Sequence, residues 1–421
     1  MKTQKIAIVG LGYVGLPLAL LISKKGMDVV GIDTDSEKLV KINNKISPIQ
    51  DERVSVELKT TNLHTSNTFD VIKDRDIIIL CVPTPVKKDK SPDYSYIVSA
   101  CENISHYLAK DQLVIIESTI NPGTTEEIII PLLENGSNLI AGTDFYIAHV
   151  PERINPGDKK WHVGNIARVV GGLNSASLGK TKELYESIID AAVYPLESIK
   201  EAEAVKIVEN CYRDINIAFV NELAMSFSHL GINLPNVIRG ASTKPFEFLP
   251  HYPGCGVGGH CIPVDPYYLI DYAKRHGFKH DLLMSARNIN NNMPKFTVGE
   301  LLESLEENGL NKNEVKVCLL GLTYKANIQD IRESPANEIL KLLKEESIAV
   351  TIHDPFITHD PLDKALNGAK AVIIATAHDE YTKLSPDYFI DKGIQVIIDG
   401  RNCLDYKSYK NSSLTYRGIG C

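Results

Sequence analysis

The feature that most constrains the fold is a glycine motif, GLGYVG at residues 10–15, which directly follows the apolar run KIAIV at residues 5–9. A GxGxxG motif alone is a weak signal, but between a strand and a helix it is typical of a dinucleotide-binding turn. The first glycine permits the tight turn, the second lets the backbone approach a pyrophosphate, and the third lets helix and strand pack closely. The phosphates then lie at the helix N-terminus, which favours negative charge. An ordinary turn without a nucleotide is the alternative. The residues expected to bind the cofactor at this turn are Gly10, Gly12, Tyr13, Val14 and Gly15.

The second predicted strand ends in GID, which places Asp33 eighteen residues after Gly15. A carboxylate there accepts hydrogen bonds from the adenosine ribose and repels a 2′-phosphate, so the sequence predicts NAD rather than NADP. Thr84 and Thr119 fall at the ends of later strands, where open α/β sheets bind their ligands. A turn-capping role for each threonine is an equal alternative to contact with the cofactor.

Strand-like and helix-like segments alternate from residue 5 to 121, which predicts a parallel sheet with helices on both faces. Residues 200–231 contain no proline and predict one helix about 45 Å long. After residue 312 the alternation of strands and helices resumes. We therefore expect an α/β protein with two Rossmann-like doubly wound domains, joined by a long helix and an all-helical middle domain. The expected boundaries are 1–199, 200–312 and 313–421.

Composition narrows the class of protein. A chain of 421 residues, 43% hydrophobic and 23% charged, is long enough for two or three domains. No window approaches the roughly 18 apolar residues of a membrane span, so we expect no transmembrane helix. The N-terminal apolar run resembles a signal peptide, but the dinucleotide turn explains it better.

A net charge of −8 without a long basic run argues against nucleic acid as a partner. Eight cysteines without a CxxC pair favour free thiols and a cytoplasmic location.

A second segment, GCGVGGHCIPVDPYY at residues 254–268, concentrates chemically active side chains. The spacing of Cys255, His260 and Cys261 fits zinc poorly, so we predict no metal site. A disulfide between the two cysteines is not expected in the cytoplasm. The glycines, Gly258 among them, let the backbone approach a ligand and leave Cys261 at the end of a loop. From these residues alone, a buried, inert cysteine is the favoured interpretation.

Three further features favour a nucleophilic thiol over an inert one. Lys206 and Asn210 are spaced i, i+4 on the long predicted helix, so a cation and an amide project from one face. Asp265 follows Cys261 by four residues and offers a carboxylate for proton transfer. Glu152 follows a predicted strand. Each residue taken singly is better explained as a solvated charge.

Seven ordered blocks together resemble one family. The blocks are GLGYVGLP, ESTINPGTTE, VPERINPG, EAEAVKIVENCYRDINIAFVNEL, GVGGHCIPVDPYYL, GLTYKANIQDIRESPA and IIDGRN. In this order and spacing they are similar to the UDP-glucose/GDP-mannose dehydrogenases, over nearly the whole chain. The resemblance implies an NAD domain, a helical dimerisation domain, a C-terminal nucleotide-sugar domain, and a homodimer or higher homo-oligomer.

The resemblance also implies a reaction, the four-electron oxidation of a sugar C6 alcohol to a carboxylate with two NAD in succession. The first oxidation gives an aldehyde that the thiolate of Cys261 captures as a thiohemiacetal. The second gives a thioester that water cleaves. Covalent capture prevents loss of a reactive aldehyde between the two oxidations.

The resemblance assigns roles residue by residue. Lys206 and Asn210 bind the developing oxyanions, Asp265 is the acid/base near the thiol, and Glu152 serves thioester hydrolysis. Thr119 helps to hold a catalytic water and also contacts the cofactor. The expected nucleotide and phosphate contacts are Lys325, Arg332 and Arg401, with Arg332 also facing the cofactor; the other expected substrate contacts are Glu152, Arg153, Lys206, Asn210 and Gly258.

Departures from the UDP-glucose pattern narrow the substrate. Pro156 stands where UDP-glucose enzymes usually carry a second glutamate, and His260 stands where they tend to have serine or tyrosine. These features resemble the branch that oxidises UDP-N-acetylhexosamines, and STKPFEFLPHYPG favours UDP-N-acetylglucosamine. UDP-N-acetylgalactosamine, UDP-N-acetylmannosamine and UDP-glucose remain alternatives, in that order. Arg153 contacts the N-acetyl group, a phosphate or another domain. A non-catalytic NAD-binding protein and a two-electron hydroxyacid dehydrogenase are the competing classes, and Cys261 argues against both.

Overall fold

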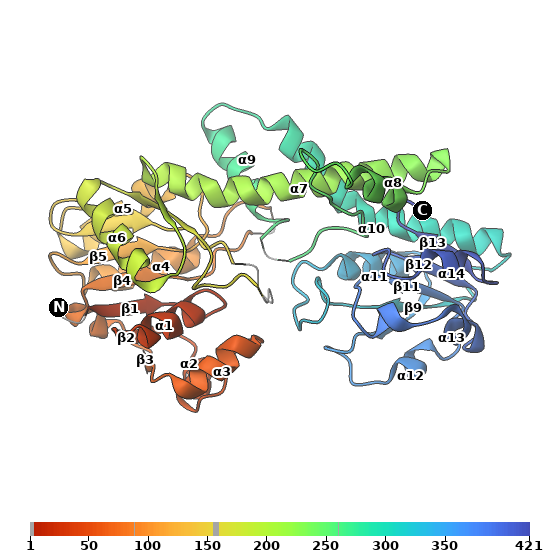
Figure 1. Cartoon of the computed structure of the whole chain (residues 1–421), viewed down its shortest axis with the longest axis horizontal. Helices are drawn as coiled ribbons and strands as arrows, with labels where there is room; N and C mark the ends of the chain where they lie inside the picture. The colour runs from red at the N-terminus through yellow and green to blue at the C-terminus, as the bar shows by residue number, and fades with distance from the viewer. Residues whose placement is uncertain (1–3, 88, 155–159, 260) are drawn as a thin grey trace. The chain divides into compact units, whose positions relative to one another are not determined.

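A computed structural model describes residues 4–87, 89–154, 160–259 and 261–421 (Figure 1). The chain forms two compact units. The first comprises Met1–Glu209 with Tyr267–Phe278, and the second comprises Asn210–Pro266 with Lys279–Cys421. In the part of the chain that is described, none of the helices combines the length and the apolar character that crossing a membrane requires.

The first unit is built on an eight-stranded sheet in the order β3-β2-β1-β4-β5-β6-β7-β8. Its strands are β1 (Lys5–Val9), β2 (Asp28–Ile32), β3 (His64–Ser66), β4 (Ile77–Leu80), β5 (Leu113–Ile116), β6 (Tyr146–His149), β7 (Arg168–Gly172) and β8 (Val193–Pro195). The run from β1 to β6 is parallel, as the alternation predicts. Strand β7 instead runs antiparallel to β6, so the sheet of the first unit is not parallel throughout.

Both faces of this sheet are buried. Ile6 and Ile8 of β1 belong to one apolar core, and Ala7 and Val9 belong to the other. Successive side chains of a strand point to opposite faces, so a strand covered on both sides is a continuous apolar run. The covering helices are α1 (Gly15–Lys24), α2 (Ser36–Asn43), α3 (Glu52–Thr60), α4 (Ser95–Ser105), α5 (Ile130–Ser137) and α6 (Ser175–Ile188). Strand β3 and helix α3 are additions to the predicted pattern.

Helix α7 (Ile199–Leu230) is the long helix expected from the sequence. Its 32 residues give a length of about 48 Å. It stops before Gly231, whose φ of +66° is a conformation that glycine adopts without strain. Helices α8 (Leu234–Ala241), α9 (Asp265–Arg275) and α10 (Asp281–Glu307) follow, which confirms the helical middle expected from the sequence.

The second unit contains a five-stranded parallel sheet in the order β10-β9-β11-β12-β13. Its strands are β9 (Lys316–Leu320), β10 (Ala349–His353), β11 (Ala371–Ile374), β12 (Val396–Asp399) and β13 (Thr415–Gly418), and its helices are α11 (Pro335–Glu345), α12 (Leu362–Leu366), α13 (Pro386–Asp391) and α14 (Tyr406–Lys410). The order reverses between β9 and β11, and ligands of such sheets bind outside the carboxyl ends at this point. The expected Rossmann-like C-terminal fold is confirmed.

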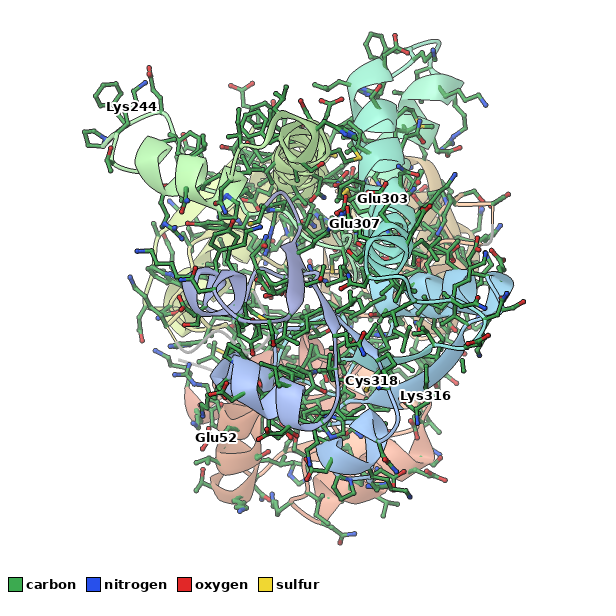
Figure 2. The ribbon with its side chains drawn as sticks, turned by 90° about the vertical axis from the view of Figure 1, so that its right-hand side faces the viewer. Glu52, Lys244, Glu303, Glu307, Lys316 and Cys318 are labelled. Atoms are coloured by element: carbon green, nitrogen blue, oxygen red, sulfur yellow. The ribbon has the colours of Figure 1, made fainter. Side chains whose placement is uncertain are left out.

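Salt bridges connect the outer strand β13 to helix α10. Arg417 contacts three glutamates of α10, with nitrogen–oxygen distances of 3.0 Å to Glu300, 3.1 Å to Glu303 and 2.6 Å to Glu307. Figure 2 labels two of them, Glu303 and Glu307. These pairs tie the last strand of the sheet to the helix that precedes its first strand.

Candidate active site

The glycine turn has the geometry that a dinucleotide requires. Gly10 has a φ of +94°, and its amide donates to the Ile32 carbonyl oxygen at 2.8 Å. A Cβ on Gly10 would lie 2.7 Å from the Cys81 carbonyl oxygen, and a Cβ on Gly15 would overlap the Gly10 carbonyl oxygen. A Cβ on Gly12 would meet no atom within 4 Å. Protein packing therefore accounts for Gly10 and Gly15, whereas Gly12 faces open space, as the approach of a pyrophosphate requires.

Asp33 lies just past the end of β2, beside the turn. One carboxylate oxygen accepts from the Leu11 amide at 2.9 Å and from Lys38 Nζ at 2.7 Å, and the other accepts from the Asp35 amide at 3.0 Å. These three donors fix the orientation of the carboxylate. The Lys38 contact was not anticipated from the sequence.

Replacing Asp33 with alanine is expected to weaken the preference for NAD over NADP. The change removes the repulsion of a 2′-phosphate and leaves the Lys38 ammonium without its carboxylate. Loss of hydrogen bonds to a charged group costs about 1.5–3 kcal/mol, so the ratio of kcat/KM values should shift by about 10-fold to 100-fold. Steady-state kinetics with both cofactors measures it. Asp35→Asn is the matched control, because Asp35 caps α2 through the Lys38 amide. An unchanged ratio in Asp33→Ala would contradict this placement of the ribose.

The two predicted threonines contact each other. Thr84 Oγ1 donates to the Thr119 carbonyl oxygen at 2.5 Å, which joins the loops after β4 and β5. The Tyr268 hydroxyl of α9 donates to the Thr84 carbonyl oxygen. Glu203 of α7, a buried carboxylate, accepts from the amides of Gly123 and Thr125 in the same loop as Thr119. Tyr268 and Glu203 were missed at the sequence level.

Glu203 is unusual for a buried acid. Burial raises its pKa to about 7, although the two amide donors oppose that shift. It lies one turn before Lys206 on α7. Glu203 therefore anchors the loop that carries Thr119 to the helix that carries Lys206.

Glu152 lies past the end of β6 and is almost fully buried. Its Oε1 accepts from the Arg153 amide at 2.6 Å and from the Ile154 amide at 2.5 Å, and its Oε2 accepts from Arg168 Nη1 at 2.7 Å. The Arg153 side chain pairs with Glu209 of α7 at 2.5 Å. Arg153 thus forms a salt bridge within the first unit, and its contact with the N-acetyl group, a phosphate or another domain stays a prediction. Pro156 lies outside the described residues.

Lys206 and Asn210 share one face of α7, as their spacing predicts. Asn210 Nδ2 donates to Asp265 Oδ2 at 2.5 Å, and Asp265 is buried at the start of α9. The Cys261 carbonyl oxygen accepts from the Asp265 amide at 2.8 Å. Cys261 is half-buried and lies in the turn that leads into α9, four residues before the helix begins. The structure thus brings together the amide, the carboxylate and the thiol-bearing residue.

The glycines before Cys261 pack closely against Tyr324. A Cβ on Gly258 would lie 2.7 Å from Tyr324 Cβ, and a Cβ on Gly259 would lie 2.8 Å from the Tyr324 ring. The loop therefore packs too tightly on residue 324 for larger side chains. Contact of Gly258 with substrate stays a prediction. Cys255 is buried with its thiol directed at the Ala375 carbonyl oxygen, so it packs as expected. His260 lies outside the described residues.

Three residues predicted to supply positive charge to the substrate site lie in loops of the C-terminal domain. Arg401 donates to the Ala375 carbonyl oxygen at 2.7 Å and to the Gly256 carbonyl oxygen at 3.4 Å, so it contacts the glycine loop. Arg332 is half exposed and pairs with Asp330 at 2.6 Å. Lys325 lies in the loop after β9, at the point where the strand order reverses. Contacts of all three with a nucleotide or a phosphate stay predictions.

A buried polar cluster that the sequence did not reveal holds this loop. Asp354 accepts from the amides of Leu322 and Thr323 and from His378 Nε2 at 3.1 Å. His378 Nδ1 accepts from the Asn327 amide at 3.0 Å. The pKa of Asp354 is lowered well below its usual value, because the hydrogen bonds from His378 and the amides outweigh its burial. The histidine and the aspartate follow β11 and β10, so spacing alone does not relate them to residue 325.

The fold and the dinucleotide turn define an NAD-dependent oxidoreductase. The chain belongs to the UDP-glucose/GDP-mannose dehydrogenase family. Its NAD-binding domain matches residues 4–189, its central domain residues 200–292 and its UDP-binding domain residues 318–406. Three matching domains in order confirm the resemblance, the fold class and the NAD cofactor inferred from the sequence.

Relatives and solved structures support the same family over the full length. The chain is 38% identical to a UDP-N-acetyl-D-mannosamine dehydrogenase of Pyrococcus horikoshii, over 99% of each chain. It is 37% identical to a UDP-N-acetyl-D-glucosamine 6-dehydrogenase of Pseudomonas aeruginosa, over 96% of this chain and 98% of the relative. The solved structure of a UDP-D-ManNAc dehydrogenase from Pyrococcus horikoshii superposes with a TM-score of 0.94 and 37% identity, covering 99% of each chain.

Proposed function

We propose that this protein is a UDP-N-acetylhexosamine 6-dehydrogenase that oxidises the sugar C6 alcohol to a carboxylate. The observation that carries the proposal is the contact between Asn210 and Asp265 beside Cys261 at the start of α9. It brings an oxyanion donor of α7 to a short segment that carries a thiol and a proton acceptor. The bound NAD supplies the hydride acceptor, and the chain supplies the rest.

Each candidate residue has a role in this chemistry. Lys206 and the Asn210 amide stabilise the oxygen at C6, and Asp265 takes or returns the proton near the thiol. The Cys261 thiolate adds to the C6 aldehyde, which forms a C–S bond and retains the intermediate. In the hydrolytic step a water held by Thr119 adds to the thioester carbon. The C–S bond breaks, its electron pair returns to sulfur, and the water proton passes to Glu152.

Within this substrate class the residues favour UDP-N-acetylglucosamine, through the segment before the glycine loop. UDP-N-acetylmannosamine is the second candidate, because the relative with 38% identity and the structure with a TM-score of 0.94 carry that name. This finding moves UDP-N-acetylmannosamine ahead of UDP-N-acetylgalactosamine. We place the reaction in the cytoplasm, in the supply of precursors for cell-envelope polysaccharides.

An NADH-release assay across purified UDP-sugars tests the proposal. Wild-type protein is incubated with UDP-N-acetylglucosamine, its manno and galacto epimers, and UDP-glucose, with NAD in excess. The product mass is recorded in each case. The proposal requires that at least one UDP-N-acetylhexosamine substrate yields two NADH per sugar and a product with a carboxylate at C6. One NADH per sugar would indicate a two-electron dehydrogenase, and NAD binding without NADH would indicate a non-catalytic protein.

We also propose that the protein forms a homodimer through α7. Tyr212 and Phe219 of α7 are 53% and 54% exposed, and Ile215 lies between them on the same face. An apolar stripe of this kind on a helix suits packing against a second copy. The dimer is the assembly that the family resemblance implies.

Phe219→Glu is expected to convert this dimer into a monomer, because it places a charge in the apolar stripe. Analytical ultracentrifugation at micromolar protein measures the assembly state. Tyr194→Glu is the matched control, since Tyr194 is an aromatic residue on β8 that is even more exposed than Phe219. A Phe219→Glu protein that sediments like wild type would exclude this face as the interface.

A further inference from the structure

A buried charged cluster lies behind Glu152 in the first unit. Arg168 is fully buried, and its Nη1 atom lies 2.7 Å from Glu152 Oε2 and 3.8 Å from Glu117 Oε2. The Tyr185 hydroxyl of α6 donates to Glu117 Oε1. The cluster, defined as Glu117, Glu152, Arg168 and Tyr185, thus contains one guanidinium and two carboxylates.

The antiparallel strand β7 creates this arrangement. The register pairs Ala148 with Gly172 and His149 with Gly171, and continuing it sets residue 152 opposite residue 168. Glu117 follows β5, the other neighbour of β6 in the sheet. Because β7 runs against β6, its first residue, Arg168, lies at the carboxyl edge where a parallel strand would place its last.

The cluster is not a saturated structural network. Among the described residues, Arg168 Nε, Arg168 Nη2 and Glu117 Oε2 are buried without a hydrogen-bond partner. Folded proteins satisfy most buried polar groups, and they depart from this rule chiefly at functional sites. Apolar side chains often replace a buried ion pair without loss of stability, so stability alone does not explain a guanidinium at this place.

We propose that Arg168 is a positioning residue that orients the Glu152 carboxylate and supplies its counter-charge for thioester hydrolysis. This inference rests on the proposed function, because it concerns the hydrolytic step of that reaction. Two amides hold Oε1 and the guanidinium holds Oε2, so the carboxylate has one orientation and a permanent counter-charge. Only an ionised Glu152 accepts the proton that the attacking water releases.

Among the described residues around Glu152, the other ionisable groups do not supply this counter-charge. Burial raises the pKa of Glu117 to about 7, so this neighbour is at most a further negative charge. Burial also raises the pKa of the Cys81 thiol and lowers that of His149 to about 3, so both groups are neutral near pH 7. Tyr185 likewise has a raised pKa through burial. The Arg153 side chain is paired with Glu209. Of the residues that the structure describes, Arg168 is therefore the cation that contacts the Glu152 carboxylate.

The test compares Arg168→Met and Arg168→Lys with wild type in acid formation from the UDP-sugar that the wild type oxidises. In Arg168→Met the charged form of Glu152 loses its counter-ion, so the acid limb of the kcat profile should move up by about 1–3 pH units. The thioester on Cys261 should accumulate and be visible by intact-protein mass spectrometry after rapid quenching. Arg168→Lys retains a cation and should recover most of the wild-type profile. The KM values for NAD and for the sugar should change less than about threefold, because Arg168 contacts neither in this proposal.

Two further variants keep the test decisive. If Arg168→Met does not fold, the double variant Arg168→Met with Glu117→Gln replaces it, since it removes the second buried carboxylate charge as well. Thr181→Val is the control for loss of a buried polar group on α6, and it should leave the pH profile unchanged. An unshifted acid limb without thioester in a folded Arg168→Met or double variant would overturn the inference. Failure of wild type to form acid would instead overturn the proposed function.

Discussion

Replacing Cys261 with serine should reduce the formation of two NADH per sugar by at least about a thousandfold. A serine hydroxyl at this position is a far weaker nucleophile than a thiolate, so the aldehyde is no longer captured and the second oxidation loses its covalent substrate. NAD binding should remain close to wild type, since the glycine turn that is expected to bind NAD lies in the first unit. The measurements are NADH release, product mass and NAD affinity by calorimetry.

The matched control is the other cysteine of the segment. Cys255→Ala removes a thiol that is fully buried among apolar side chains, and it should retain the stoichiometry of two NADH per sugar. The pair of variants therefore separates loss of a nucleophile from loss of packing in the loop. Normal turnover to acid by Cys261→Ser would exclude a covalent mechanism through this residue.

The elements with strong local signals were predictable from the sequence. Helix α11 begins at Pro335 after the Ser334 cap and ends at Glu345, the bounds that its sequence indicates. Helix α7 differs from the expected range by one residue at each end, because no proline or glycine interrupts it before Gly231. The glycine turn was predictable for a different reason, because its backbone conformation requires glycine at particular positions.

What the sequence could not reveal depends on strand direction and on long-range contacts. The direction of β7 decides that Arg168 meets Glu152, and no local pattern encodes it. The contacts of Asp354 with His378, and of Glu203 with the loop after β5, join residues 24 and 78 positions apart. In each case the available signal was a charged residue next to a strand end or within a buried helix face, which is too common to single out a partner.

A further such network spans the helices of the second unit. Arg287 of α10 contacts Asp214 of α7 at 2.5 Å, and both side chains are almost fully buried. Asn290 Nδ2 donates to Asp214 Oδ1 at 2.8 Å and is joined in turn by Asn221, whose Oδ1 accepts from the Gly254 amide at 3.0 Å. The network therefore extends from a buried ion pair to the first residue of the segment that carries Cys261.

Arg287→Met is expected to lower the free energy of unfolding by about 3–5 kcal/mol, because it leaves the Asp214 carboxylate buried without its cation. Urea denaturation measures the loss. The double variant Arg287→Met with Asp214→Leu should recover most of it, since apolar side chains of similar volume replace a buried ion pair at little cost. Turnover should separate the two effects. The double variant also removes the carboxylate that orients Asn290, so the anchor of Gly254 weakens and kcat should fall even where stability returns. Full recovery of both stability and kcat would mean that the ion pair has no part in holding the loop of Cys261.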